Sequence, residues 1–248
     1  MSSGAFAALA LGLLLGLKHA TDADHVVAVS TIVSQTRNAW KSIWIGGSWG
    51  LGHTAPLIVL GVIILLLKES VLDRYEAVAP VFEFGVGIML VLLGIQVFLN
   101  LRKGRLHMHE HEHDESHHVH VHSTHGEAAP PHVEERHGIF QLTGRPTFRM
   151  KSFVVGIVHG LAGSAAVMLA LLPEVSSFAV GVGYLVLFGV GTVLSMSIIT
   201  IVLAVPFALT GAFNKVNRAI SGVSAAASVA FGIALMLEIS TGATIIPF

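Results

Sequence analysis

The sequence predicts an all-α polytopic membrane protein, and three observations support that prediction. Hydrophobic residues make up 53% of the 248 residues and charged residues only 12%, against about 25% charged residues in an ordinary soluble domain. The mean hydropathy is +0.76. Apolar runs long enough to cross a hydrocarbon core of about 30 Å recur along the chain, and a soluble fold of this length could not bury all of them.

We expect about six transmembrane helices, one for each long apolar run. The first and fifth runs exceed the roughly 20 residues that a straight span needs, so we expect these helices to tilt or break. Pro56 and Pro206 are the expected kink or break points of the second and fifth helices. The predicted spans are residues 4–34, 43–67, 80–101, 153–172, 177–209 and 219–239.

Lysine and arginine residues gather on one side of this arrangement. By the positive-inside rule the richer side is cytoplasmic, which places both termini outside and the central loop in the cytoplasm. The opposite side carries only Lys68 and Arg74. The predicted cytoplasmic residues are Arg37, Lys41, Arg102, Lys103, Arg105, Arg136, Arg145, Arg149, Lys151, Lys215 and Arg218.

Short sequence matches link the two halves of the chain. GLKHA at residues 16–20 resembles GIVHG at 156–160, and WGLGHT at 49–54 resembles FGVGTV at 188–193. Three spans per half would make the second half an inverted copy of the first, as is common in secondary transporters, although helix packing alone also produces glycine matches. We expect two inverted three-helix repeats, residues 1–101 and 151–248, joined by a cytoplasmic His-rich loop at 102–150.

Polar residues interrupt the first predicted span. HATDADHVV at residues 19–27 carries two aspartates in an apolar run, although one aspartate at a bilayer centre costs about 2.5–3.5 kcal/mol. A regular helix turns about 100° per residue, which places His19, Asp22 and His25 on one face and Asp24 away from it. Local unwinding would bring Asp24 into the same site. The pattern indicates a divalent-cation site, with a structural hydrogen-bond network or a proton relay as alternatives.

Two further histidines lie in other predicted spans. His53 stands about one turn before Pro56, and His159 lies among small residues that let helices approach closely. Either histidine alone could serve only as an interhelical hydrogen-bond partner. The chain has no cysteine, and imidazole with carboxylate suits nickel, cobalt or zinc. The candidate metal ligands are His19, Asp22, Asp24, His25, His53 and His159.

The central loop carries most of the 15 histidines of the chain. Its low apolar content, mixed charge and paired prolines at 130–131 predict disorder over residues 107–137. Alternating histidines in a flexible segment can collect divalent metal at low affinity and release protons as they do so. The alternative is a solvated linker that tolerates histidine.

The chain resembles the nickel/cobalt transporter family (NiCoT), since HATDADH fits that family's membrane signature H-x-x-x-x-D-H. LGHT at residues 51–54 is similar to the family's second histidine motif, and GIVHGLAGS at 156–164 resembles the branch of urease-accessory-type nickel permeases. The resemblance implies that His19, Asp22, Asp24 and His25 handle the metal and that His53 supports them.

The resemblance also implies the cargo and the partners. Nickel, or alternatively cobalt, is the implied ion, the protein lies in a lipid bilayer, and cytoplasmic metallochaperones of a nickel enzyme such as urease are the implied recipients. The chain departs from the eight-span members, because we expect it to lack their first span and its second half has no aspartate–threonine–glutamate motif. These departures bear on metal preference and on the later transport steps.

The sequence thus predicts a secondary transporter rather than an enzyme. It would be a multi-pass cell-membrane permease that carries divalent transition-metal cations by alternating access, in the direction of uptake, with His53 and His159 completing or gating the site. No catalytic residue, cofactor or nucleic-acid partner is predicted, and the chain has no G-x-x-x-x-G-K-[ST] motif. The alternatives are a metal exporter of the same fold, an intramembrane zinc metalloenzyme with the same ligands, and a metal sensor without flux.

Overall fold

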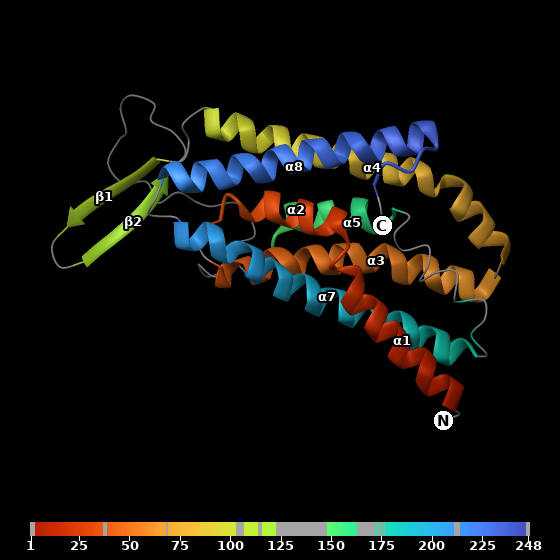
Figure 1. Cartoon of the computed structure of the whole chain (residues 1–248). Coiled ribbons are helices and arrows are strands. Elements are labelled where there is room, and N and C mark those ends of the chain that lie inside the picture. Colours follow the sequence, from red (N-terminus) through yellow and green to blue (C-terminus); the bar gives the residue numbers. More distant parts are fainter. Residues whose placement is uncertain are drawn as a thin grey trace.

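The computed structural model is built from long helices that run side by side (Figure 1). It describes residues 3–36, 39–67, 69–102, 107–113, 116–122, 148–162, 172, 175, 177–210 and 214–246. The helices are α1 (Ser3–His19), α2 (Ala23–Val33), η1 (Trp40–Ser42), α3 (Ile43–Leu67), α4 (Glu69–Arg102), α5 (Met150–Gly160), α7 (Phe178–Leu209) and α8 (Asn214–Thr241). The central loop contributes the strands β1 (His107–His113) and β2 (Ser116–His122).

The predicted all-helical membrane fold is confirmed for the described residues outside the central loop. Within them, α3, α4, α7 and α8 are each long and apolar enough to cross a membrane, and α1 with α2 form a further candidate span that is bent by 50°. The predicted break in the first span is therefore present. Of the predicted fourth span, 153–172, the structure describes only residues 153–162 and residue 172, so the count of six reaches beyond the described residues.

The two prolines that were expected to kink or break their helices do not interrupt them. Pro56 lies inside the continuous helix α3, and Pro206 lies inside α7. Membrane helices tolerate proline because neighbouring helices and Ser/Thr side chains satisfy the backbone groups that proline frees. Near the end of α7, the Thr210 hydroxyl donates to the carbonyl of Pro206 at 2.7 Å.

Local sequence signals set several helix ends. Ser177 is the N-cap of α7, where its Oγ accepts a hydrogen bond from the backbone N–H of Val180 at 3.3 Å, as Ser often does at this position. Gly242 follows the last residue of α8 with φ +67°, a conformation that favours glycine directly after a helix. Its backbone N–H donates to the carbonyl of Glu238 at 2.8 Å.

The helices pack in pairs, and the pairing is matched between the halves of the chain. Helix α4 packs along α8, α3 packs along α7, α1 crosses α7 and α5 packs on α3 (Figure 1). If α1, α3 and α4 correspond to α5, α7 and α8, the α1–α7 pair of helices corresponds to the α5–α3 pair. The α3–α7 and α4–α8 pairs each join two corresponding helices. Helix α2 lies in the middle of the bundle, against α4, α7 and α8.

Glycine contacts repeat the same match at the level of single residues. A Cβ added at Gly16 of α1 would collide with the carbonyl oxygen of Phe188, and one added at Gly156 of α5 would collide with that of Trp49. These four residues occupy corresponding positions of the sequence matches. Close backbone approach through small residues is typical of membrane helices, and the matched contacts support the predicted inverted repeat.

The His-rich loop contributes a short backbone hairpin at its start. The backbone of β1 and β2 forms an antiparallel hairpin in which His107 pairs with His122 and His113 with Ser116. The alternation of histidine with other residues has the two-residue period of an extended strand, which accounts for the pairing. Residues 114–115 and 123–137 of the predicted disordered segment lie outside the described residues.

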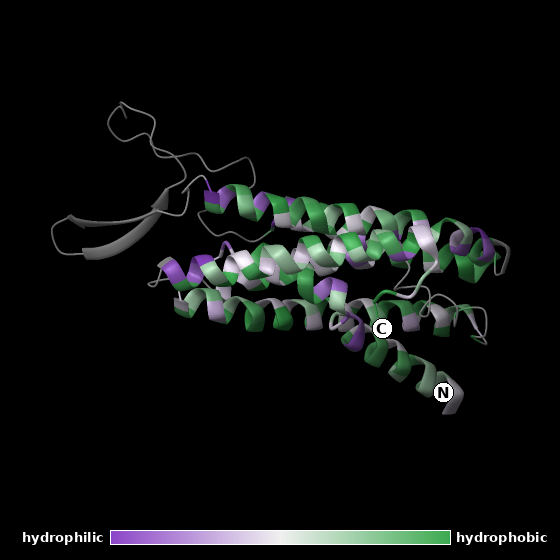
Figure 2. Cartoon of the chain, turned by 45° about the horizontal axis from the view of Figure 1, so that its top comes forward, coloured by the Kyte–Doolittle hydropathy of each residue, from purple (hydrophilic) through white to green (hydrophobic). Residues whose placement is uncertain are grey.

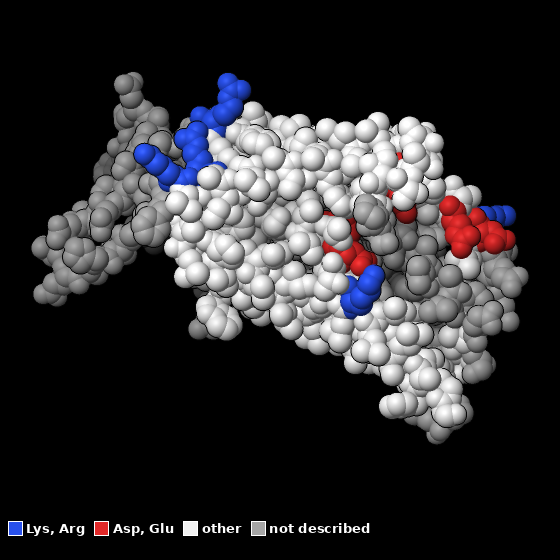
Figure 3. All heavy atoms as spheres, in the orientation of Figure 1, with Lys and Arg blue, Asp and Glu red and all other residues white. Residues whose placement is uncertain are grey.

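Polarity follows the long axis of the bundle. Figure 2 shows apolar residues over most of the helices, with hydrophilic residues at the two ends and between α1 and α2. In Figure 3, basic side chains gather at one end of the bundle, the end from which β1 and β2 extend in the same view of Figure 1, and acidic side chains gather at the opposite end. This distribution suits a membrane-spanning protein, and the assignment of the hairpin end to the cytoplasm stays a prediction.

The matched glycine contacts lead to a stability prediction. Gly52→Ala would drive a methyl group into the carbonyl of Phe153, and Gly191→Ala would place one 2.6 Å from the carbonyl of Leu13. Overpacking of this kind costs about 1–3 kcal/mol, so each variant should lower the apparent melting temperature in detergent by about 2–10 °C.

Two other glycines provide the control for this measurement. A Cβ added at Gly85 or Gly222 would meet nothing within 4 Å, and alanine favours a helix over glycine by up to about 1 kcal/mol. Gly85→Ala and Gly222→Ala should therefore leave the melting temperature unchanged or raise it. A drop of equal size in all four variants would contradict the packing argument.

Candidate metal centre

The site begins at the break between α1 and α2. The Thr21 hydroxyl and backbone N–H both donate to the carbonyl of Lys18, at 2.6 and 2.8 Å, and so close the last turn of α1. Asp22 is the N-cap of α2 in an extended conformation, and its carbonyl accepts from the N–H of Val26 at 3.1 Å. Its side chain makes no capping bond. The carboxylate is instead free to bond to side chains of α1.

The break changes which aspartate lies inside. A regular helix would point Asp22 inward with His19 and His25, and Asp24 elsewhere. In the structure the Asp24 side chain is 12% exposed and contacts two fully buried histidines, whereas the Asp22 side chain is 19% exposed and contacts the exposed Lys18. The alternative of local unwinding is the one that the structure has, because α2 starts anew after residue 22 and its first turn carries Asp24 toward the other helices.

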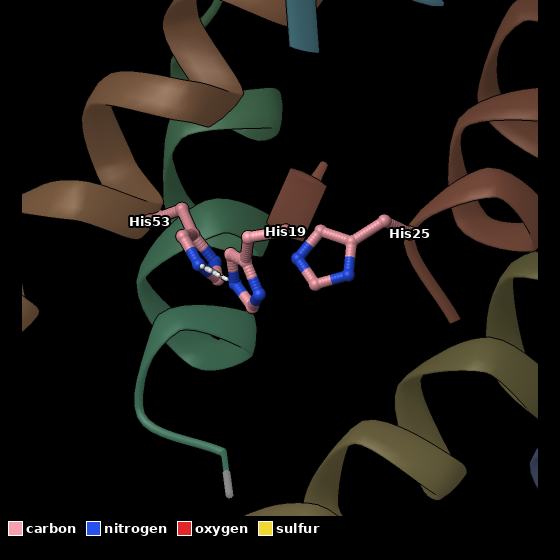
Figure 4. Close-up of side chains that lie close together, drawn as sticks. All are labelled: His19, His25 and His53. Carbon is pink, nitrogen blue, oxygen red and sulfur yellow. Dashed lines mark hydrogen bonds between the residues drawn. The ribbon is translucent and has the colours of Figure 1, made fainter. Parts of the chain in front are cut away.

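Three buried histidines from three helices form the first part of the site. His19, His25 and His53 come from α1, α2 and α3, and their ligand atoms lie within 4.8 Å of one another. Figure 4 shows the three rings side by side, with the bond between His19 Nε2 and His53 Nε2 at 2.8 Å. None of the three is more than 4% exposed.

Asp24 joins this group to the second half of the chain. Its Oδ1 lies 2.8 Å from His25 Nδ1, and its Oδ2 lies 2.8 Å from Nε2 of His159, which α5 contributes. The rings of His25 and His159 stack with centroids 4.1 Å apart. Asp24, His25 and His159 thus form a second group, with ligand atoms within 4.8 Å of one another. His25 belongs to both groups, and all six predicted site residues lie in one connected cluster.

The hydrogen bonds determine which ring nitrogens carry protons. A carboxylate only accepts, so His25 donates through Nδ1 and His159 through Nε2, both to Asp24. His19 Nδ1 likewise donates to Asp22 Oδ2 at 3.0 Å, and its Nε2 then accepts from Nε2 of His53. In neutral rings, each remaining nitrogen holds a lone pair.

Those remaining nitrogens are the ones without partners. His25 Nε2, His53 Nδ1 and His159 Nδ1 are buried and make no hydrogen bond within the described part of the chain. A buried polar atom left unpaired costs about 1–3 kcal/mol, and three of them in one cluster require a compensating interaction. Imidazoles that donate one N–H to a carboxylate and offer the other nitrogen are typical of metal sites.

Two aromatic side chains enclose the cluster, and the sequence analysis did not single them out. Trp49 is fully buried and stacks on His25 at a centroid distance of 5.9 Å, with His159 5.5 Å away. The ring centroid of Phe188 lies 5.6 Å from that of His19. A signal was present, because Trp49 lies four residues before His53 on one helix face and Phe188 is its match in the second half.

Comparison with known proteins gives the family. The chain matches the NicO family, described as high-affinity nickel-transport protein, over residues 5–241. It is 37% identical to the urease accessory protein UreH of Bacillus sp. (strain TB-90) over 232 residues, which cover 93% of this chain and 91% of that protein. No solved structure matches it.

Two more distant relatives share parts of the sequence. The chain is 25% identical to the Arabidopsis thaliana chloroplast protein FOR GROWTH AND FERTILITY 1, over 92% of this chain and 58% of that protein. It is 32% identical to a high-affinity nickel transport protein of Cupriavidus necator over 72 residues, 29% of this chain and 20% of that protein. The match over most of its length shows that the chain belongs to the family of high-affinity nickel-transport proteins.

Proposed function

We propose that the chain is a multi-pass permease that carries nickel ions across the cell membrane through the His–Asp cluster, in the direction of uptake. One observation carries this proposal: His25, His53 and His159 each keep a buried ring nitrogen without a partner, inside a cluster that two aspartates orient. Membership of a nickel-transport family supports nickel as the cargo.

The spacing of the donor atoms suits one divalent ion. Two imidazole nitrogens bound to the same ion at about 2.1 Å lie about 3 Å apart when adjacent and about 4.2 Å apart when opposite. The donor atoms of each group lie within 4.8 Å of one another. Nitrogen donors of this kind bind nickel, cobalt and zinc, and the family membership favours nickel.

We propose that the aspartates act mainly through the histidines. Asp24 accepts from two rings and Asp22 from one, which holds each ring in one tautomer and adds negative charge beside the ion. That charge offsets the cost of a divalent cation in a low-dielectric interior. The cation in turn makes the buried carboxylates tolerable.

The matched halves support alternating access. The cluster takes His19, His25 and His53 from the first half and His159 from the second, so it lies where the halves meet. Rocking of one repeat against the other around a fixed site is the usual movement in inverted-repeat transporters. Trp49 and Phe188, which occupy matching sequence positions and contact different histidines of the cluster, are the proposed closing side chains.

The sidedness and the recipient are parts of the same proposal. Both termini would lie outside and the His-rich hairpin (Figure 1) in the cytoplasm, at the end of the bundle where basic side chains gather (Figure 3). One relative is named a urease accessory protein. We therefore propose that cytoplasmic metallochaperones of a nickel enzyme such as urease receive the ion.

Replacing the central aspartate should stop transport. Asp24→Asn keeps the side-chain size, but its amide nitrogen cannot accept a hydrogen bond, so either His25 or His159 loses its acceptor. We expect nickel uptake by proteoliposomes to fall at least about 10-fold, measured with a radioactive nickel isotope.

A second aspartate provides the matched control. Asp73→Asn removes an equal charge from an exposed position of α4 and should leave uptake unchanged. Uptake that survives in Asp24→Asn would refute the proposed site. Turnover of a lipid or peptide in place of flux would favour the intramembrane metalloenzyme.

Deleting the His-rich segment tests whether it belongs to the transport site. Without residues 107–137 we expect the initial rate of nickel uptake to stay within about twofold, because every residue of the cluster remains. The number of nickel ions bound per chain, measured by calorimetry on the purified protein, should fall, because loop histidines bind metal at low affinity. Complete loss of uptake in a folded deletion variant would place an essential ligand in the loop.

A further inference from the structure

Lys18 lies beside the cluster, and the proposed mechanism gives it no role. It is the penultimate residue of α1, and its Nζ lies 3.0 Å from Asp22 Oδ1. The other oxygen of Asp22 accepts from His19 Nδ1 at 3.0 Å. One carboxylate is thus shared between an ammonium group on the outside and an imidazole of the cluster on the inside.

The surroundings of this ion pair are unusual for a membrane span. The side chain of Lys18 is 73% exposed, against 19% for Asp22. Helix α1 ends near the middle of the bundle (Figure 1), and basic and acidic atoms meet midway along that face (Figure 3). The middle of a hydrocarbon core lies about 15 Å from either interface, farther than the roughly 6 Å that a lysine side chain reaches. An aqueous opening at the break between α1 and α2 would solvate this ammonium group.

We propose that Lys18 is a tethered cation that occupies the Asp22 carboxylate while the site holds no metal, and that the incoming divalent cation displaces it at the mouth of the site. This inference rests on the proposed function. The ammonium group satisfies the charge of Asp22 in the empty protein. When the metal arrives, Asp22 turns to His19 and the ion, and Lys18 moves into the opening.

Such a tether weakens metal binding in a defined way. If Asp22 is free for only a fraction of the time, the apparent dissociation constant rises by the inverse of that fraction. The same competition promotes release, because Lys18 returns to the carboxylate as the metal leaves. Val158, which is 40% exposed, stands at the matching position of the second half. Only the first half therefore has a lysine at this position.

The test removes the charge and keeps the length of the side chain. We expect Lys18→Gln in the full chain to bind nickel about three- to tenfold more tightly by calorimetry, since the competing ion pair is gone. In proteoliposomes its KM for nickel should fall by a similar factor, and its maximal rate should fall because release is slower. Lys18→Arg keeps the cation and should behave like the unaltered chain.

Two controls separate this competition from other effects. Lys215→Gln removes an equal charge from an exposed position at the start of α8 and should change neither affinity nor rate. In an Asp22→Asn background the effect of Lys18→Gln on affinity should shrink, because the carboxylate for which the two cations compete is absent. An effect of unchanged size in that background would overturn the proposal.

Two results for Lys18→Gln would overturn the proposal. If Lys18 instead positions Asp22 for the metal, Lys18→Gln will bind nickel more weakly, and that result overturns the proposal, as does no change at all. Asp24→Asn is measured in parallel. Nickel uptake retained in Asp24→Asn refutes the proposed function, whereas loss of uptake there with unchanged affinity in Lys18→Gln refutes only the tether.

Discussion

The bridge formed by Asp24 is the interaction on which the rest of the site depends. Its two oxygens accept from His25 of α2 and from His159 of α5, at 2.8 Å each. These bonds hold two rings in stacked contact and join the first half of the chain to the second. They also fix the tautomer of each ring, which leaves one nitrogen of each without a partner. A buried carboxylate is costly, and here three N–H donors, two from rings and one from the backbone of His25, offset that cost.

Close packing of the helices brings the rings of the cluster within reach of Asp24. Glycines at the crossing points of α1 with α7, and of α3 with α5, let the backbones approach until a Cβ would collide. His19 follows Gly16 by one turn, and His159 follows Gly156 in the same way, so each histidine emerges directly beyond a close crossing. The same spacing in both halves explains why their two sets of side chains meet in the middle of the bundle.

The predictable part of the structure is the part that local sequence determines. Helix α3 has the predicted bounds, 43–67, because its apolar run ends where the chain becomes polar. Helix α4 starts at Glu69 rather than at residue 80, since a helix continues into polar sequence outside the hydrocarbon core. All six metal-site candidates meet in one cluster, yet the inward role of Asp24 depends on a break whose exact position no periodicity specifies. Trp49 was missed because a tryptophan in an apolar span carries no polar signal of its own.

The arrangement of protons in the cluster also bears on which ions the protein would admit. Magnesium and calcium, the abundant divalent ions of cells, prefer oxygen ligands and bind imidazole poorly. Three of the four aspartate oxygens already accept N–H groups from histidine rings, so most of the donors left for an ion are nitrogens, and Asp22 Oδ1 joins them only when Lys18 has moved. On the proposed mechanism a single oxygen is too few for an alkaline-earth ion, and scarce late transition metals can be taken up in the presence of magnesium and calcium.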